Sequence, residues 1–452
     1  MKNRIRSKNF LVKFENIFLF LCSWSLLFIL PHFQTKFGFV TIFSQVFISV
    51  SLLYTINRAL GHFEDLEKFL KSNIFFLFPL LYLVSIVLNL FGKDELYKFI
   101  NRFGAGSMIL DGKIYMFGDL AHLTKASSCT ISVQIGRNIC DPFDRPFNQN
   151  PHLVDFLKIT HFSDTSKLGL VSTLTFFILI LIVAYKNQIR SLTLFIMLLS
   201  PPIVLAIDRG NEIITILLLL PGLLLIVKHK SCQTFGAFLL ALSCFYKLWP
   251  IAILIPIFFL FSNKLNIYSK FTLTFPIVYW MYFHDNASRM LEVTQKGSPL
   301  GLSFGLAHYI NSTIELKFVV LFCVLVLLFC IYFFSKSILF NQYLYVYSAN
   351  LVILNALLIT YISIWILGTS FIYRLIIFIP IIVFLNKAIK EKIPRDMLES
   401  VILLTMLTSK LSITTVFTSC LAIIFSAILA YQLILFLKKR SIFHHLKSNK
   451  NI

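Results

Sequence analysis

Long runs of apolar residues, separated by short polar connectors, make up most of this chain. A helix needs roughly 20 apolar residues to cross a bilayer, and most of the runs approach that length. We therefore expect an all-α integral membrane protein, a polytopic helical bundle that forms one domain over residues 1–452. The runs lie at about 14–30, 37–56, 73–90, 168–185, 191–207, 213–227, 235–246, between Pro250 and Lys264, 271–283, 318–334, 343–366, between Ser370 and Lys387, 398–407 and 412–437. We expect about 12 to 14 membrane-spanning helices, because the seventh, eighth and thirteenth runs are too short for a full span and fit re-entrant or broken helices.

The short basic connectors alternate along the chain and set the orientation. Basic residues are enriched on the cytoplasmic side of membrane proteins, so both termini are expected in the cytoplasm. The third run then exits outward, and residues 91–166 form a long extracytoplasmic loop. Long connections of this kind are uncommon and often functional. We expect a multi-pass protein of the bacterial inner or plasma membrane rather than of the endoplasmic reticulum.

The composition agrees with this pattern and excludes some functions. The chain has 58% hydrophobic and 13% charged residues, whereas an average soluble domain has about 25% charged residues. The net charge of +21 comes from basic residues that lie between apolar runs, not from a patch with interleaved aromatic residues. We therefore expect membrane lipids, and no nucleic acid, as partners.

Polar residues of four segments fall on the outer side of the expected helices. The segments are Asp119 in the long loop, the turn Asp208–Glu212, Lys247 beside Trp249, and Tyr373 with Arg374. Ionisable residues at the edges of apolar helices are costly and often functional. Arg209, Lys247 and Arg374 together fit a site for a lipid phosphate, because a guanidinium pairs with two oxygens at once. Each cation taken alone could equally extend its charge to the interface from a helix end.

Asp119 has two interpretations. Beside a phosphate site, its carboxylate could take the proton of an attacking sugar hydroxyl. Alternatively, Asp119 could simply cap the helix that is expected to start at Leu120. The local sequence favours the capping role, and only the expected proximity of the three cations favours the role of general base.

The rest of the long loop contains residues with structural or chemical potential. Cys129 and Cys140 are expected to form a disulfide in an oxidising compartment, although two free thiols are the alternative. Asp141 and Asp144 are second candidates for a carboxylate role, or residues of Asx turns. The His and Cys residues lack metal-ligand spacing, so we expect neither a metal nor another cofactor.

Three motifs resemble a known family. Ser200-Pro201-Pro202, Asp208-Arg209-Gly210-Asn211-Glu212 and Lys247-Leu248-Trp249-Pro250 resemble, in order and spacing, the polyprenyl-phosphate-mannose-dependent α-mannosyltransferases of glycosyltransferase family 87. These are membrane enzymes of the GT-C class. Phe117-Gly118-Asp119-Leu120 is similar to the first-loop aspartate of that class, although Asp119 follows the third expected helix rather than the first. Two additional amino-terminal helices would account for this difference.

The resemblance implies an inverting membrane glycosyltransferase. It would transfer a hexose, such as mannose, from a polyprenyl-phosphate-sugar donor to an acceptor glycan or glycolipid on the extracytoplasmic face. Asp119 would be the general base, and Arg209, Lys247 and Arg374 would bind the donor phosphate. The supporting residues would be Asp208, Asn211, Glu212, Tyr373 and Trp249.

Other functions fit the same pattern. A transporter or flippase would account for the helices and the outer cations, but it predicts related halves and more polar positions within helices. A polysaccharide polymerase or ligase of cell-envelope assembly would also use a large outer loop and essential arginines. A non-catalytic assembly subunit is a further alternative.

Overall fold

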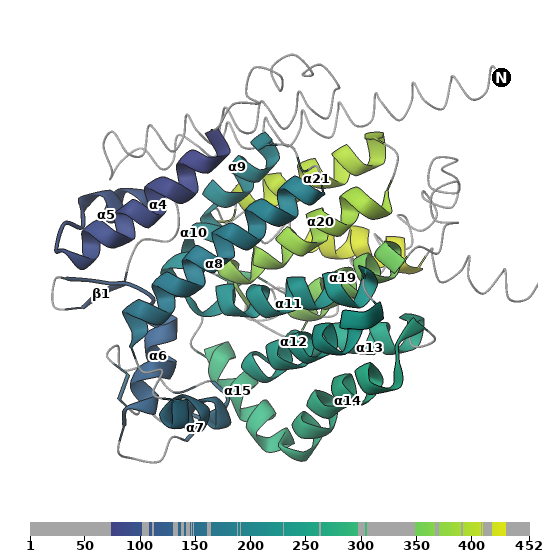
Figure 1. The fold of residues 1–452 in the computed structure, drawn as a ribbon, viewed down its shortest axis with the longest axis horizontal. Helices are drawn as coiled ribbons and strands as arrows, with labels where there is room; N and C mark the ends of the chain where they lie inside the picture. The colour runs from purple at the N-terminus through teal and green to yellow at the C-terminus, as the bar shows by residue number, and fades with distance from the viewer. Residues whose placement is uncertain are drawn as a thin grey trace, which may run out of the picture.

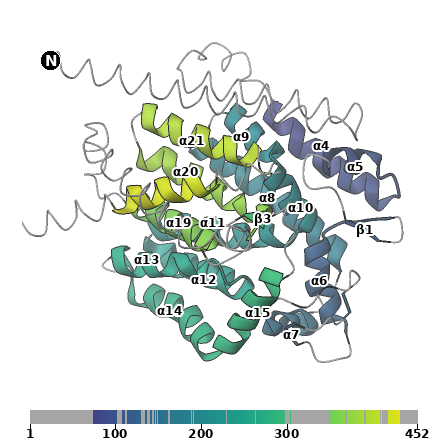
Figure 2. The ribbon, with the colours of Figure 1, turned by 180° about the vertical axis from the view of Figure 1, so that it is seen from behind.

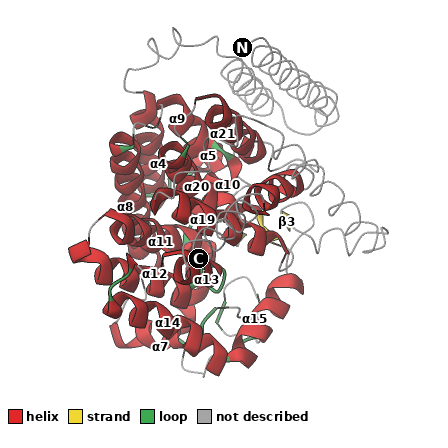
Figure 3. Cartoon of the chain, turned by 90° about the vertical axis from the view of Figure 1, so that its right-hand side faces the viewer, coloured by secondary structure: helices red, strands yellow, loops and turns green. Residues whose placement is uncertain are grey.

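The computed structural model describes residues 74–296, 303–304 and 349–430, with short gaps within these ranges. The first two expected helices, the tenth and the basic carboxyl-terminal tail lie outside the described residues. Helices make up nearly all of the described chain (Figure 3). The described strands form two short antiparallel pairs: β1 (Met108–Leu110) with β2 (Lys113–Tyr115), and β3 (Ser303–Phe304) with β4 (Ser370–Phe371). The predicted helical bundle is thus confirmed at the level of fold class.

Figure 1 shows the arrangement of the described helices. They are α4 (Ile74–Leu90), α5 (Glu95–Asn101), α6 (Gly118–Ser127), α7 (Pro151–Thr160), α8 (Thr165–Lys186), α9 (Ser191–Leu199), α10 (Pro201–Arg209), α11 (Asn211–Lys228), α12 (Gln233–Tyr246), α13 (Ile251–Phe261), α14 (Ile267–Tyr282), α15 (His284–Lys296), α19 (Ala349–Ile366), α20 (Phe378–Ala388), α21 (Lys392–Leu407) and a last helix, Thr418–Ala430. Most of the described helices coincide with apolar runs of the sequence, and α5, α6, α7 and α15 lie in the polar segments between them. Two 3₁₀ segments, η2 (Lys230–Cys232) and η5 (Ile372–Ile377), precede α12 and α20.

Within the described residues, α8 alone is a single helix long and apolar enough to cross a membrane. The pair α10 and α11 would be a second span if its bent halves were counted together. The expected number of spanning helices therefore stays a prediction.

The fifth expected helix is in fact two helices. The run at 191–207 breaks at Ser200 into α9 and α10, because Pro201 and Pro202 have no backbone N–H to continue the hydrogen bonds of α9. Both prolines suit the first turn of α10, where the backbone N–H groups have no partner within the helix. A second break follows at Gly210, whose φ of +76° ends α10, and the chain bends by 106° into α11.

The described part of the long segment 91–166 has secondary structure of its own. It contains α5, the β1–β2 hairpin, α6 and α7. Figures 1 and 2 show α6 and α7 at one end of the molecule, away from α9 and α21. The segment thus builds a small helical cap on the end of the bundle where α10 meets α11.

Glycines allow the two central helices to approach closely. A Cβ at Gly222 of α11 would lie 2.9 Å from the carbonyl oxygen of Gly236 in α12, and a Cβ at Gly236 would lie 2.8 Å from the carbonyl oxygen of Gly222. Small residues at such crossings are common where helices pack in a membrane. This close contact fixes the relative position of the two chain segments that carry Glu212 and Lys247.

Candidate functional site

A buried phenylalanine fixes the start of α6, which carries Asp119. Phe117 is fully buried and has a φ of +58°, a left-handed conformation that is uncommon for a bulky residue. Its ring fills the space that a side chain at Gly169 of α8 would need, and it lies against Gly210 between α10 and α11. The two glycines therefore let Phe117 lock α6 beside the Arg209–Gly210 turn.

The carboxylate of Asp119 lies between two arginines. Its Oδ1 accepts a hydrogen bond of 2.6 Å from Nη1 of Arg145 and lies 4.0 Å from Nη1 of Arg209. The cap of α6 is Phe117 rather than Asp119, and no side chain provides the cap hydrogen bond. The capping role that local sequence favoured for Asp119 is therefore wrong, because the arginines engage the carboxylate instead.

Arg145 is the main contact that the sequence did not reveal. Its guanidinium donates to both oxygens of Asp141, at 2.9 and 3.0 Å, and to the carbonyl oxygen of Gly118 at 2.7 Å. The backbone N–H of Arg145 also donates to Asp141. Asp141 thus serves a turn and an ion pair together, while the side chain of Asp144 lies outside the described residues. The turn-rich sequence at 140–146 was the available signal, but it did not indicate which residue the arginine would reach.

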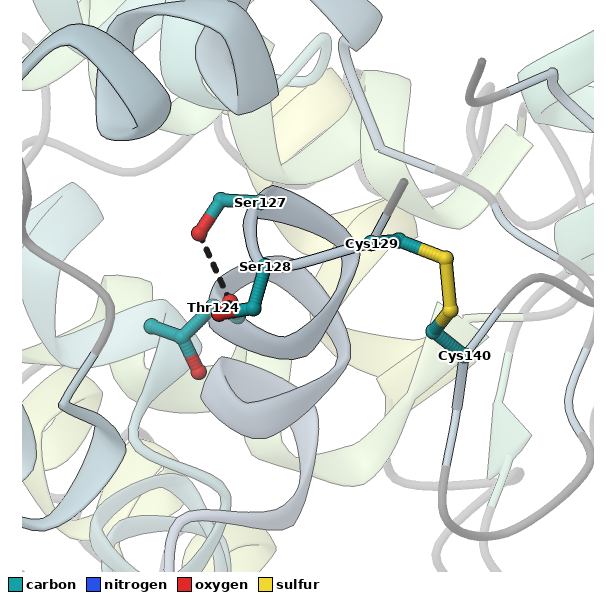
Figure 4. The surroundings of a disulfide bond; sticks show 5 residues. All are labelled: Thr124, Ser127, Ser128, Cys129 and Cys140. Carbon is teal, nitrogen blue, oxygen red and sulfur yellow. Dashed lines mark hydrogen bonds between the residues drawn. A yellow bond between two sulfur atoms is a disulfide. The ribbon is translucent and has the colours of Figure 1, made fainter. Parts of the chain in front are cut away.

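A disulfide connects this loop to the other end of α6. Cys129 directly follows the last turn of the helix, and its sulfur is bonded to that of Cys140, next to Asp141 (Figure 4). The Cα atoms of the two cysteines are 6.1 Å apart. Within the last turn, the hydroxyl of Ser127 donates to the carbonyl oxygen of Thr124. The loop is therefore attached to α6 at its carboxyl end by the disulfide and at its amino end by Arg145.

These contacts set the charge of the loop groups. Burial would raise the pKa of Asp119, but the charges of Arg209, Arg145 and Lys247 outweigh it and hold that pKa below its usual value. Burial also opposes ionisation of Asp141, and hydrogen bonds from Arg145 again leave its pKa lowered. Both carboxylates are therefore ionised at neutral pH.

A second ion pair joins the first turn of α11, which carries Glu212, to the residue that follows α12, Lys247. Nζ of Lys247, directly after α12, donates to Oε1 of Gln149 at 3.1 Å and lies 3.9 Å from Oε1 of Glu212. The indole N–H of Trp249 donates to the other oxygen of Glu212 at 3.1 Å. Lys247 is also within electrostatic range of Arg374, in η5, and of Asp119. Asp119, Arg209, Lys247 and Arg374 therefore belong to one charged cluster, which we call the Asp119 cluster.

Asp208 has a different environment from that expected of a supporting residue. Its Oδ1 accepts hydrogen bonds from the hydroxyl of Tyr97 at 2.8 Å and from Nδ2 of Asn101 at 2.9 Å. The hydroxyl of Tyr82 donates in turn to Asn101. This buried network attaches α10 to α4 and α5, so Asp208 positions the helix that presents Arg209. The side chains of Asn211 and Tyr373 lie outside the described residues.

No group of three or more His, Cys, Asp or Glu residues that could hold a metal ion occurs in the described ranges.

The comparisons with known proteins add no relative. No family model, no curated protein and no solved structure matches this chain.

Proposed function

We propose that this protein is a polytopic membrane glycosyltransferase of the GT-C type, which transfers a hexose from a polyprenyl-phosphate donor to a glycan or glycolipid on the outer face. The supporting observation is the Asp119 cluster. An ionised carboxylate lies 4.0 Å from Arg209, Lys247 is within electrostatic range of that carboxylate, and Arg374 is within electrostatic range of Lys247. Segments more than 200 residues apart in the sequence provide these side chains.

The chemistry needs one carboxylate and several cations. Asp119 accepts the proton of the acceptor hydroxyl as its oxygen bonds to the anomeric carbon. The bond from that carbon to the phosphate oxygen breaks, and its electron pair stays on the phosphate. Arg209, Lys247 and Arg374 stabilise the charge that grows on the leaving phosphate. Attack from the side opposite the leaving group inverts the anomeric carbon, and a single base is enough.

The low pKa of Asp119 has a consequence for this role. Arg145 keeps the carboxylate ionised but also occupies one of its oxygens. The Asp119–Arg145 contact therefore has to lengthen as an acceptor hydroxyl approaches, which raises the basicity of Asp119 when it is needed. Catalytic hydrogen bonds commonly rearrange in this way between the free and the bound enzyme.

Exposed apolar faces support the membrane assignment. On α8, Val171, Ile178 and Ile182 are 60%, 49% and 48% exposed, at helical spacing. On α14, Phe271 and Val278 are 78% and 55% exposed. Soluble monomers rarely expose apolar patches of this extent, and lipid tails would cover both faces.

The orientation has a direct test. Cys232 in η2 is exposed and is expected in the cytoplasm, whereas Asp155 in α7 is expected outside. With the other thiols replaced by serine, a membrane-impermeant maleimide should label Asp155→Cys, but not Cys232, in intact cells. Labelling of Cys232, but not of the cysteine at position 155, would show that the orientation is the opposite of the expected one.

The test of activity is a transfer assay with purified protein and a panel of radiolabelled polyprenyl-phosphate hexoses. Asp119→Asn should reduce transfer by about 10²-fold or more, because loss of a general base typically costs 10²–10⁴-fold. Asp155→Asn is the matched control, since this carboxylate is exposed on α7 and should leave transfer unchanged. Full transfer by Asp119→Asn would remove Asp119 from the mechanism.

One observation favours a second candidate, a transporter or flippase. The bend of 106° between α10 and α11 resembles the broken helices at transporter binding sites. A transporter would move a lipid-linked sugar without transferring it. A dithionite-quenching assay with a fluorescent polyprenyl-phosphate sugar in proteoliposomes would detect this movement, and movement that persists in Asp119→Asn would favour the transporter.

A further inference from the structure

Three buried polar groups near the Asp119 cluster have incomplete hydrogen bonding. Nε2 of His122, the hydroxyl of Tyr246 and Oε1 of Glu212 have no hydrogen-bond partner within the described part of the chain. Their residues are 4%, 8% and 0% exposed. Buried polar atoms in proteins are nearly always hydrogen-bonded, so a group of exceptions needs an explanation.

The three groups lie near the same charged residues, Asp119 and Lys247. His122 lies one turn after Asp119 on α6 and is within electrostatic range of Asp119 and Lys247. Tyr246 directly precedes Lys247 and is within electrostatic range of Glu212 and Asp119. Oε1 of Glu212 is 3.9 Å from Nζ of Lys247, which is too long for a hydrogen bond. Three helices, α6, α11 and α12, therefore bring these side chains to the Asp119 cluster.

The chemistry of these groups matches hydroxyls better than phosphate. Burial, together with the nearby charge of Arg145, lowers the pKa of His122 to about 4, so its imidazole is neutral at pH 7. A neutral imidazole and a phenol can each donate or accept a hydrogen bond, and a carboxylate accepts only. A sugar ring presents hydroxyls that do both. The negative charge of Glu212 disfavours a phosphate next to it, so the phosphate lies nearer to Arg209 and Arg374. Lys247, which is within electrostatic range of both Glu212 and Arg374, adjoins both groups.

We propose that His122, Tyr246 and Glu212 form a subsite that binds the ring hydroxyls of a neutral hexose and excludes sugars with a carboxylate. This inference rests on the proposed function, because it assumes that the Asp119 cluster accepts a glycosyl substrate. It adds the residues that select the sugar, and it separates them from the cations that bind phosphate.

The test measures binding without transfer. Methyl hexopyranosides and a methyl glucuronide are titrated against the full chain in nanodiscs, with saturation-transfer NMR as the readout. We expect at least one neutral hexoside to bind and the glucuronide not to bind. Tyr246→Phe and His122→Gln should each weaken binding about five- to tenfold, the usual worth of one hydrogen bond to a neutral group. Tyr185→Phe and His152→Gln are the controls, since both side chains are exposed.

Monodeoxy hexosides provide a test that needs no variant. Removing the hydroxyl that contacts Tyr246 should weaken binding to the native chain about as much as Tyr246→Phe does, and the two changes together should cost no more than either alone. Binding that is equal for every deoxy hexoside and every variant would overturn the subsite. If hexosides bind as expected but no transfer is detected, the subsite stands and the proposed function fails. If transfer depends on Asp119 while the subsite variants leave both hexoside binding and the KM of the donor unchanged, the subsite fails alone.

Discussion

Replacing Arg145 by Gln should destabilise the cap formed by α6 and its loop. The guanidinium makes three hydrogen bonds to carboxylates, one to Asp119 and two to Asp141, and its side chain is 27% exposed. Hydrogen bonds to charged groups contribute about 1.5–3 kcal/mol each, and breaking a buried ion pair costs about 3–5 kcal/mol. Because the contacts are coupled and partly screened by solvent, we expect a loss of about 3 kcal/mol.

Hydrogen exchange of α6 measures this loss locally. A change of about 3 kcal/mol corresponds to roughly 10²-fold faster exchange of protected amides in α6. The effect should depend on pH. Arg145 lowers the folded-state pKa values of Asp119 and Asp141, so its stabilisation is complete above their unfolded values and is lost as pH falls through the folded ones. Native protein and variant should therefore differ most at neutral pH and converge in acid.

Arg289→Gln is the control, because this arginine is exposed on α15. Arg145→Lys keeps the charge but not the forked geometry, and it should recover only part of the protection. If Arg145→Gln left hydrogen exchange in α6 unchanged at pH 7, the contacts of Arg145 would not stabilise α6 and the prediction would be refuted.

Three further predictions concern α6 with its loop and the contact between α11 and α12. Replacing Cys129 and Cys140 by serine should lower the free energy of unfolding by about 2.8 kcal/mol, because the unfolded chain is no longer restricted by a loop with a sequence separation of 11. The melting temperature should fall, and dithiothreitol should lower it equally in the native protein. An unchanged melting temperature would contradict this prediction. Gly222→Ala should cost about 1–3 kcal/mol, because the new Cβ meets the backbone of α12 at 2.9 Å; unchanged thermal stability would show that the helices separate without cost. His122→Gln should flatten the dependence of stability on pH. In the native chain the folded-state pKa of His122, about 4, lies below its unfolded value, so stability falls by up to about 3 kcal/mol as the pH drops from about 6.5 towards 4. The variant lacks this titrating group and should not show that loss. Parallel pH profiles of melting temperature for the native chain and this variant would contradict that account.

The helical class was evident from the sequence because it depends on local features. A long apolar run with few glycines or prolines predicts a helix whatever its tertiary surroundings are. The observed bounds of α8 and α11 lie close to the predicted ones. The break at Ser200 was missed, although its cause, two consecutive prolines, is itself local. Asp119, Arg209, Lys247 and Arg374 were singled out because charge at the edges of apolar helices is costly.

What the tertiary structure decided was which of these groups lie together and what holds them. Neither the contact of Arg145 with Asp119 nor the orphaned atoms of His122 and Tyr246 can be seen in a linear sequence. Such contacts depend on distances between helices, which are set here by the close approach at Gly222 and by the ring of Phe117 against Gly169. A sequence specifies where a charge or a glycine stands along one helix, but packing with the other helices determines what each of them meets.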